Sequence, residues 1–560
     1  MISKILTYPV VQTFDTPQGT PEFEEKRALL LQEFWDKVPQ ELYLTQNIIS
    51  NPPTHVMDIP STCGILTPEE VEITENYDAT GLAEAIATKK YSAVAVVTAF
   101  AKRAIICHQL TCCLTQWFMD SAIERAKELD EHLKKTGMTV GPLHGVPISI
   151  KEHMPITGTY SSQGCFASIV KDDQDCEMVA ILRSMGAVFY CKTNQPQTIM
   201  HLESDSHWGR VLNPHNIHLS AGGSTGGEAA LITMYGSPLG IGTDIGGSVR
   251  GPSAFCGIYG FKPTSYTLPM KGFLATAFPA ELNVLCSTGP MCRTLRDMEL
   301  FMRLVLSTKP YLIDPRIIPI PWTGSATSVE KKLKVGIISN DGFIEPQPPV
   351  KRAIAWAKKA LSDPKFADII EVKGFQPYDA REAWYKIRHM YWPDAGKVSK
   401  DAIFSTGEPL HPLSEWIWKD AETLGMQDAV QVSQARAERD EYRCKFAESW
   451  NEQDVDVVVG PAFVGPACAH DTAFYWTYTS LYNFVDYPGV VFPTPIKTEA
   501  NETYVDDYVP LSEECKHVRE LWEASNFEGA PVDLQINARK YHDNYLFGAL
   551  EILKDALELK

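Results

Sequence analysis

The sequence predicts an α/β fold: one large domain in which a large, mixed, twisted sheet is covered by helices on both faces. Short apolar segments typical of strands alternate with helical segments along most of the chain, and such interleaving produces a sheet covered on both sides. Hydrophobic residues make up 44% of the 560 residues and charged residues 22%, which is enough for a sizeable core. No repeat or low-complexity linker divides residues 82–556.

The N-terminal part differs from the rest of the chain. Residues 22–38 (EFEEKRALLLQEFWDKV) have the amphipathic pattern of a helix, and a connector rich in Pro, Asn and Ser follows them. We therefore expect residues 1–75 to form a helical extension that packs on the core, and residues 76–560 to form the main, catalytic domain.

The regular pattern begins near residue 82. Residues 82–109 predict one or two helices, and residues 115–135 predict another that ends at Gly137, since glycine commonly follows the last turn of a helix. In GVPISIKE (residues 145–152), apolar residues alternate with polar or small ones, which indicates a short strand.

The remaining elements continue the alternation of helices and strands. They are a helix over 176–186, a strand over 187–192, a helix over 294–306, a strand over 332–339, a helix, strand and helix within 351–397, a helix over 428–450, a strand over 455–460, a Tyr-rich helical stretch over 474–484, strands at 489–493 and 532–536, and a last helix from 540.

Composition excludes several classes of function. The formal net charge of −19 argues against non-specific binding to nucleic acid or to anionic membranes, since both are polyanionic. No signal peptide and no run of about 18 apolar residues is apparent, so no membrane span is expected. The 13 cysteines form no Cys-x-x-Cys pair, which is typical of reduced thiols and predicts a cytoplasmic protein.

The most informative stretch is residues 219–264, which contains two Gly-Gly-Ser triplets ending at Ser224 and Ser248. Glycine is concentrated where a chain turns sharply or approaches a ligand closely. Two such turns, each presenting a serine and separated by an apolar, helix-like run, indicate a catalytic loop system.

Two familiar interpretations of this stretch are disfavoured. A phosphate-binding loop needs a third glycine where Ile245 stands, or a Lys-Ser or Lys-Thr pair after Gly227, and neither is present. Gly222 to Gly226 match the G-x-S-x-G pattern of α/β-hydrolases, but that motif requires a preceding strand, and NPHNIHLSA is predicted to be a loop.

A third interpretation combines the serines with a lysine. A serine hydroxyl is a weak nucleophile until a base removes its proton. Lys151 directly follows the strand over Val146–Ile150, at a sheet end where active-site groups lie. Its pKa would have to fall by about two to three units, at a cost of roughly 3 to 4 kcal/mol. The alternative at this point is an exposed lysine that ends an edge strand.

The motifs GVPISIKE, GGSTGG and GTDIGGSVRGPSAFCGIYGFKPT together resemble the amidase signature family, which cleaves amides with a Ser-cisSer-Lys triad. The resemblance runs from about residue 82 to the C-terminus, through DVVVGPA and GAPVDLQINARKYHDN. It looks most like fungal acetamidases and general amidases, and less closely like fatty acid amide hydrolase.

The resemblance implies roles for individual residues. Ser248 matches the nucleophile, Lys151 the terminal base, and Ser224 the intervening serine, whose peptide bond with Gly223 would be cis. The predicted oxyanion hole consists of backbone N–H groups, those of Ile245, Gly246, Gly247 and Ser248. Asp244 and Arg250 match residues that support this turn. The family mechanism needs no cofactor and no metal, so none is expected.

Other positions are weaker candidates. Met200 and His201 follow a loop that borders the acyl pocket in relatives, and Thr225 replaces the second hydroxyl of the family's usual Ser-Ser pair. All three are predicted to bind substrate. Asp533 stands where the family commonly has glycine, and it could face either the substrate region or the surface. The histidines near residues 144–218 are attributed to polar loops, since no set of metal ligands accompanies them.

The predicted function is hydrolysis of a linear carboxylic amide through an acyl-enzyme on Ser248, with a small-molecule amide as the partner. Two alternatives remain: a glutaminase-type subunit of an amidotransferase, and a catalytically silent relative that binds a ligand. A homodimer is one candidate for the assembly. The sequence does not identify the amide.

Overall fold

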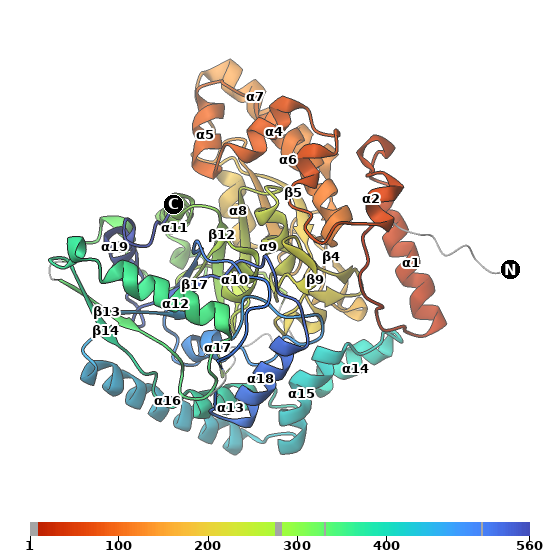
Figure 1. The fold of residues 1–560 in the computed structure, drawn as a ribbon. Helices are drawn as coiled ribbons and strands as arrows, with labels where there is room; N and C mark the ends of the chain where they lie inside the picture. The colour runs from red at the N-terminus through yellow and green to blue at the C-terminus, as the bar shows by residue number, and fades with distance from the viewer. Residues whose placement is uncertain (1–8, 275–282, 330–331, 506–507) are drawn as a thin grey trace.

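A mixed sheet of 11 strands forms the centre of the computed structural model, which describes residues 9–274, 283–329, 332–505 and 508–560 (Figure 1). In spatial order the strands are β1 (Leu114–Trp117), β5 (Val188–Thr193), β2 (Pro147–Lys151), β10 (Leu239–Asp244), β12 (Ser287–Cys292), β11 (Tyr259–Lys262), β16 (Gly489–Phe492), β17 (Leu534–Asn537), β15 (Val457–Pro461), β13 (Leu333–Ile337) and β14 (Ile370–Gly374). Strand β2 runs parallel to β5 and β10, and β13 runs parallel to β14 and β15, whereas the other pairs are antiparallel. The predicted mixed sheet is confirmed.

Helices surround this sheet. They are α1 (Pro21–Trp35), α2 (Gln46–Ser50), α3 (Ile59–Thr62), α4 (Pro68–Glu75), α5 (Ala79–Ala87), α6 (Ala93–Thr111), α7 (Met119–Thr136), α8 (Glu177–Ser184), α9 (Gly226–Thr233), α10 (Arg250–Cys256), α11 (Leu295–Ser307), α12 (Pro348–Leu361), α13 (Ala380–Tyr391), α14 (Lys397–Ser405), α15 (Pro412–Leu424), α16 (Ala429–Glu452), α17 (Thr477–Phe484), α18 (Glu513–Glu523) and α19 (Asp543–Leu553). Short two-stranded sheets pair β3 (Tyr160–Ser161) with β4 (Val170–Lys171), β6 (Asp205–Ser206) with β7 (Gly209–Arg210), and β8 (Leu212–Asn213) with β9 (Asn216–Ser220).

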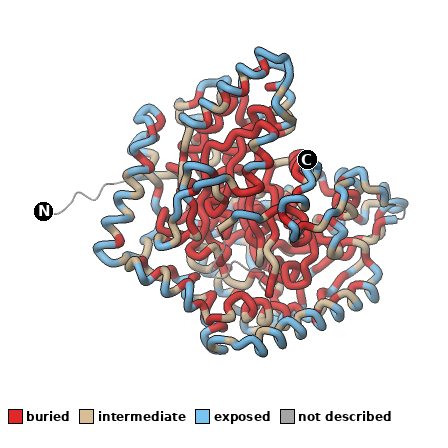
Figure 2. The backbone as a smooth tube through the Cα atoms, turned by 180° about the vertical axis from the view of Figure 1, so that it is seen from behind, coloured by how far each residue is buried: buried red, intermediate tan, exposed pale blue. Residues whose placement is uncertain are grey.

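The two faces of the sheet pack against different helices. Successive side chains of a strand point to opposite faces, and β5 follows this rule: Phe189 belongs to the apolar cluster of α8, α11, α12 and α19, whereas Val188 and Tyr190 belong to that of α6 and α9. A third cluster fills the space among α13 to α17. The buried residues form a continuous interior with exposed helices around it (Figure 2). Helices therefore cover both faces, as predicted.

Several predicted boundaries need correction. The helix expected over 115–135 begins only at Met119, because residues 114–117 form the edge strand β1. It ends as predicted, with Gly137 in the left-handed conformation at φ 71°. The stretch before Ser224, predicted as a loop, contains the hairpin of β8 and β9. Strand β10 was not predicted, because LGIGTD lies in the glycine-rich stretch that suggested turns.

The N-terminal extension shares its core with the following helices. Phe34 and Trp35 of α1 belong to the same apolar cluster as most of α6. Of the described helices, α6 alone is long and apolar enough to cross a membrane by length and composition, and 78% of its apolar window is buried inside the protein. The domain boundary at residues 75 and 76 stays a prediction.

Candidate active site

The parallel pairing of β2 and β10 brings the predicted site residues to one edge of the sheet. Ser149 lies beside Gly240 and Ile150 beside Ile241. The carboxyl ends of both strands therefore meet, which places Lys151 near Thr243 and near the turn that follows Asp244. Strand β10 runs directly into this turn, and α10 begins two residues after Ser248. The strand missed in the sequence is thus the one that carries the nucleophile candidate.

Lys151 is completely buried and makes two close polar contacts. Its Nζ lies 2.6 Å from Ser224 Oγ and 3.4 Å from Thr243 Oγ1. Burial lowers the pKa of Lys151 to about 7, although the charges of Cys286, Asp244 and Glu228 act in the opposite direction. The alternative of an exposed lysine at an edge strand is therefore wrong. A substantial fraction of Lys151 is neutral at pH 7, as a general base requires.

Ser224 is held between two tightly packed glycine segments. The peptide bond between Gly223 and Ser224 is cis. A Cβ at Gly223 would lie 2.6 Å from the backbone nitrogen of Glu203 and 2.6 Å from the carbonyl oxygen of His201. Real Cβ atoms essentially never make contacts this short, so only glycine fits here without a shift of the backbone. The adjacent Thr225 N–H donates to the Ser248 carbonyl at 3.1 Å, which joins the two serine segments.

Ser248 is 7% exposed and lines a small cavity. The cavity is bordered by Met200, His201, Leu202, Ile245, Gly246, Ser248, Tyr391 and Trp476. In the described ranges no hydrogen bond joins the hydroxyls of Ser224 and Ser248, so the closest contact of the predicted relay is the one between Lys151 and Ser224.

The weaker substrate-binding predictions have different outcomes. Met200 and His201 lie at the cavity, and burial lowers the pKa of His201 to about 4, so its ring is neutral at pH 7. Thr225 is not one of the described residues that line the cavity, because its side chain packs beside Gly242 of β10.

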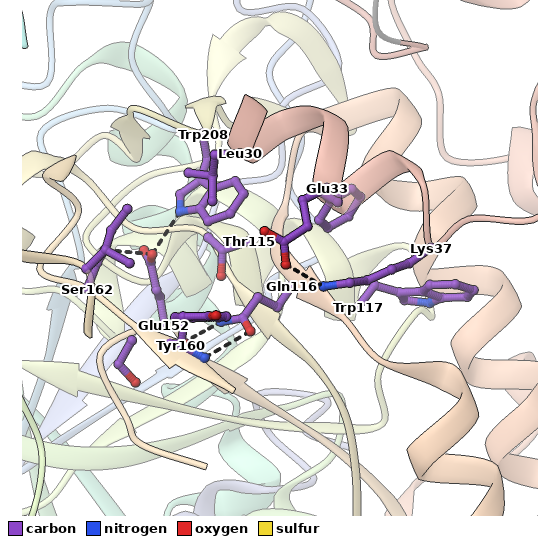
Figure 3. Close-up of a pocket in the computed structure, with 13 residues that line it drawn as sticks. Leu30, Glu33, Lys37, Thr115, Gln116, Trp117, Glu152, Tyr160, Ser162 and Trp208 are labelled. Carbon is purple, nitrogen blue, oxygen red and sulfur yellow. Dashed lines mark hydrogen bonds and ion pairs between the residues drawn. The ribbon is translucent and has the colours of Figure 1, made fainter. Parts of the chain in front are cut away.

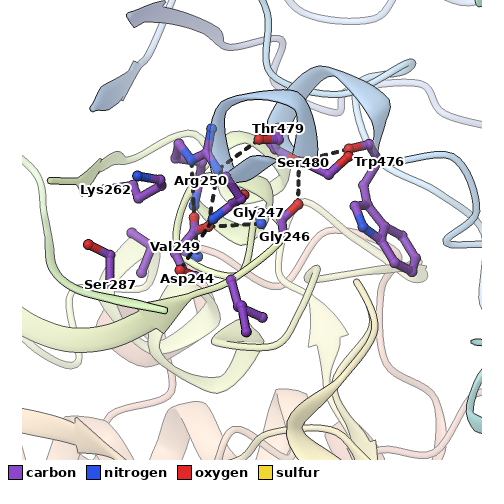
Figure 4. Close-up of polar contacts among 12 residues, drawn as sticks. Asp244, Gly246, Gly247, Val249, Arg250, Lys262, Ser287, Trp476, Thr479 and Ser480 are labelled. Atoms are coloured by element: carbon purple, nitrogen blue, oxygen red, sulfur yellow. Dashed lines mark hydrogen bonds and ion pairs between the residues drawn. The ribbon is translucent and has the colours of Figure 1, made fainter. Parts of the chain in front are cut away.

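A buried ion pair supports the nucleophile turn (Figure 4). The Arg250 guanidinium contacts both carboxylate oxygens of Asp244 at 3.1 Å, and the carboxylate accepts from the backbone N–H groups of Gly247 and Val249. Arg250 also donates to Asn483 Oδ1 at 2.7 Å. The pKa of Asp244 falls well below its usual range, chiefly through Arg250, although burial alone would raise it.

This geometry changes the predicted oxyanion hole. The Gly247 N–H donates to Asp244 at 2.9 Å and is therefore not a free donor. Within the described residues, no hydrogen bond uses the N–H groups of Ile245, Gly246 or Ser248. These three amides are the ones that remain available to a ligand at the cavity.

Two side chains from distant helices fix the peptide planes of the turn. The Tyr391 hydroxyl donates to the Ile245 carbonyl at 2.8 Å, and the Thr479 hydroxyl donates to the Gly246 carbonyl at 2.8 Å. Because C=O and N–H point in opposite directions in a trans peptide, these bonds also fix the directions of the Gly246 and Gly247 N–H groups.

Sequence reasoning identified neither of these residues as part of the site. No sequence motif marked Tyr391 as a residue of the site. The segment over 474–484 was predicted only as a Tyr-rich helical stretch, although Trp476 lines the cavity and Thr479 holds the turn.

The other sequence candidates lie away from this chemistry. Both carboxylate oxygens of Asp533 are buried without a hydrogen-bond partner in the part of the chain that the structure describes, so the alternative in which Asp533 faces the surface is wrong. Nor is it among the described cavity-lining residues. Four of the histidines attributed to polar loops, His144, His153, His201 and His207, are instead buried. No group of three or more His, Cys, Asp or Glu residues suited to a metal occurs among the described residues.

Comparison with known proteins gives the same family in each case. The family model described as Amidase matches residues 95–547. The chain is 42% identical over 499 residues to "Putative amidase C550.07" of Schizosaccharomyces pombe, covering 89% of this chain and 92% of that one. It is 34% identical to the acetamidase of Aspergillus oryzae, covering 87% and 90% of the two chains. The solved structure of a fatty acid amide hydrolase superposes with a TM-score of 0.89 at 32% identity, covering 97% and 95%.

Proposed function

Since the chain belongs to the amidase family, we propose that it hydrolyses a carboxylic amide through an acyl-enzyme on Ser248. The products are a carboxylate and ammonia or an amine. The observation that carries this mechanism is the buried Lys151 Nζ at 2.6 Å from Ser224 Oγ, beside the turn that presents Ser248.

The proton path follows from these positions. Neutral Lys151 accepts the proton of Ser224 while Ser224 accepts that of Ser248, and Ser248 Oγ attacks the amide carbonyl carbon. The new oxyanion accepts hydrogen bonds from the free N–H groups of Ile245, Gly246 and Ser248, each of which contributes roughly 10² to 10³ in rate where such donors have been removed.

Breakdown of the tetrahedral intermediate uses the same groups in reverse. The proton held on Lys151 returns through Ser224 to the leaving nitrogen, because an unprotonated amide nitrogen is a very poor leaving group. The C–N bond then breaks and the acyl group stays on Ser248. Water, deprotonated along the same path, attacks the ester and releases the carboxylate.

The direct test is to treat wild type and Ser248→Ala with a serine-directed fluorophosphonate and to measure ammonia released from a panel of short aliphatic and aryl amides. We expect wild type to be labelled once and to release ammonia, and Ser248→Ala to do neither. Persistent labelling of Ser248→Ala would contradict the assignment of the nucleophile. Labelling of wild type without release from any amide would favour a catalytically silent relative.

A cytoplasmic location remains part of this proposal. It is supported by the 13 cysteines, all of which are free thiols and most of which are buried.

A further inference from the structure

A second cavity of about 170 Å³ lies between α1 and the edge of the sheet at β1 (Figure 3). It shares no lining residue with the cavity at Ser248 among the described residues. Its walls are largely apolar and come from α1, from β1 and from the segment around residue 208. The large apolar side chains in these walls include those of Leu30, Phe34, Trp117 and Trp208. An engineered apolar cavity of about 150 Å³ holds benzene, so this one accommodates a ligand with a body about the size of one ring.

One side of the cavity carries polar atoms that lack partners. Glu152 is 2% exposed, and its Oε1 accepts from the Ser162 hydroxyl at 2.6 Å and from the Trp208 indole N–H at 2.8 Å. Its other oxygen, Oε2, has no hydrogen-bond partner within the described ranges, and neither has the buried Thr115 hydroxyl. Leaving a buried polar atom unpaired is unfavourable, and more so for a charged one, so a ligand that pairs with such an atom gains affinity. Both atoms belong to residues that line the cavity.

The charges around Glu152 are already paired with one another. Lys192 contacts Asp172 at 2.7 Å, and both side chains are buried. At the mouth, Lys37 contacts Glu33 at 3.3 Å on the exposed face of α1. Glu152 is therefore the carboxyl without an ion-pair partner among the described charged groups that line or adjoin the cavity. The complementary ligand group is a cation that donates hydrogen bonds.

We propose that this cavity binds a small organic ammonium ion whose apolar body is about the size of one benzene ring. The ammonium group carries three donors, which suit Glu152 Oε2 and the Thr115 hydroxyl. The body packs against Trp117 and Trp208, whose ring faces also attract a cation. This binding does not depend on amide hydrolysis.

The ionisation of Glu152 makes the proposal testable by pH. Burial raises its pKa to about 7, while Ser162, Trp208, Lys192 and the Gln195 amide act to lower it. The carboxyl is ionised mainly above pH 7. Between pH 8 and pH 5.5 its ionised fraction falls by about 30-fold, and the affinity for an ammonium ion should fall in parallel.

The experiment is isothermal titration of benzylammonium chloride into the full-length Ser248→Ala variant, which cannot turn over an amide. We expect saturable binding at pH 8 that weakens about 30-fold at pH 5.5 and at least tenfold in Ser248→Ala/Glu152→Gln. Ser248→Ala/Glu25→Gln removes an exposed carboxylate of α1 that is not among the described cavity-lining residues, and it should bind as Ser248→Ala does. The neutral isostere benzyl alcohol should bind more weakly than benzylammonium at pH 8 and show no pH dependence.

Three outcomes would each overturn the proposal. Benzyl alcohol could bind as tightly as benzylammonium, the affinity for benzylammonium could be unchanged in Ser248→Ala/Glu152→Gln, or benzylammonium could bind more tightly at pH 5.5 than at pH 8. If that variant does not fold, Ser248→Ala/Leu30→Trp tests the same point by filling the cavity from α1. It should abolish binding while Glu152 remains, and binding that persists in it would place the ligand elsewhere. Because every variant carries Ser248→Ala, the outcome is independent of whether the wild type hydrolyses amides.

Discussion

Lys151 Nζ lies 2.6 Å from Ser224 Oγ inside a site where the lysine is completely buried. The same burial that lowers the pKa of Lys151 to about 7 leaves a neutral amine beside the hydroxyl that it would deprotonate. The base and the serine next to it thus come from segments 73 residues apart. Four predictions follow from this arrangement and its surroundings.

The rate of hydrolysis should depend on the protonation of Lys151. Only the neutral amine accepts a proton, so kcat/KM should rise with pH and level off above about 7. Between pH 7 and pH 5 the neutral fraction falls from about one half to about one hundredth, so kcat/KM should fall about 50-fold. The measurement is ammonia release from one amide across this range.

The control for this profile is Glu228→Gln, because the buried Glu228 has a pKa raised to about 8 by burial and also titrates near this range. The inflection should remain in this variant. Its disappearance would assign the titration to Glu228 instead of Lys151.

Thr479→Val should lower kcat with little change in KM. The Thr479 hydroxyl fixes the Gly246 carbonyl at 2.8 Å, and this carbonyl belongs to the residue whose own N–H is one of the three free donors at the cavity. We expect a fall in kcat of about tenfold, less than for loss of an oxyanion donor itself. Ser480→Ala is the matched control on the same helix, since among the described residues its hydroxyl hydrogen-bonds to the Thr477 carbonyl alone. Equal effects of the two substitutions would argue that α17 is merely destabilised.

Gly223→Ala should destabilise the protein and abolish activity. The new methyl group would lie 2.6 Å from the backbone of both Glu203 and His201, and backbone atoms cannot move aside cheaply. Overpacking of this kind costs about 1 to 3 kcal/mol or more. Gly374→Ala provides the control, because no atom of the described residues lies within 4 Å of the Cβ that it would add. Denaturant unfolding measures the stability of both variants. A Gly223→Ala variant that is as stable and as active as Gly374→Ala would contradict the tight packing around Gly223.

Asp533→Asn should stabilise the protein at alkaline pH. Burial raises the pKa of Asp533 well above its usual range, with only the Thr494 backbone opposing it. The folded state therefore holds a proton that the unfolded chain releases above about pH 4, so the wild type loses stability as pH rises. The variant should match the wild type at pH 4, and its advantage should grow by about 1.4 kcal/mol for each pH unit until the raised pKa of Asp533 is reached. The exposed Asp173→Asn serves as the control, and an Asp533→Asn effect that does not change with pH would refute this account.

The sequence by itself determined the local features of this protein. Alternating apolar residues fixed β2, amphipathic periodicity fixed α1 and α11, and Gly137 fixed the end of α7, because each depends on residues adjacent along the chain. The resemblance of the glycine-rich motifs to the amidase signature family also pointed to the family to which the chain belongs.

The tertiary structure decided what depends on distant contacts. In LGIGTD, Leu239 and Ile241 alternate with glycines, which are depleted in strands, so the local signal is weak and pairing with β2 and β12 establishes the strand β10. Tyr391 and Thr479 support the nucleophile turn from segments more than 140 residues away, and Asp244 withdraws the Gly247 N–H from the predicted oxyanion hole. The low pKa of Lys151 likewise requires a surrounding core that excludes water. No local sequence pattern predicts this desolvation or these long-range hydrogen bonds. Both arise only when the sheet brings together strands that are far apart in the sequence.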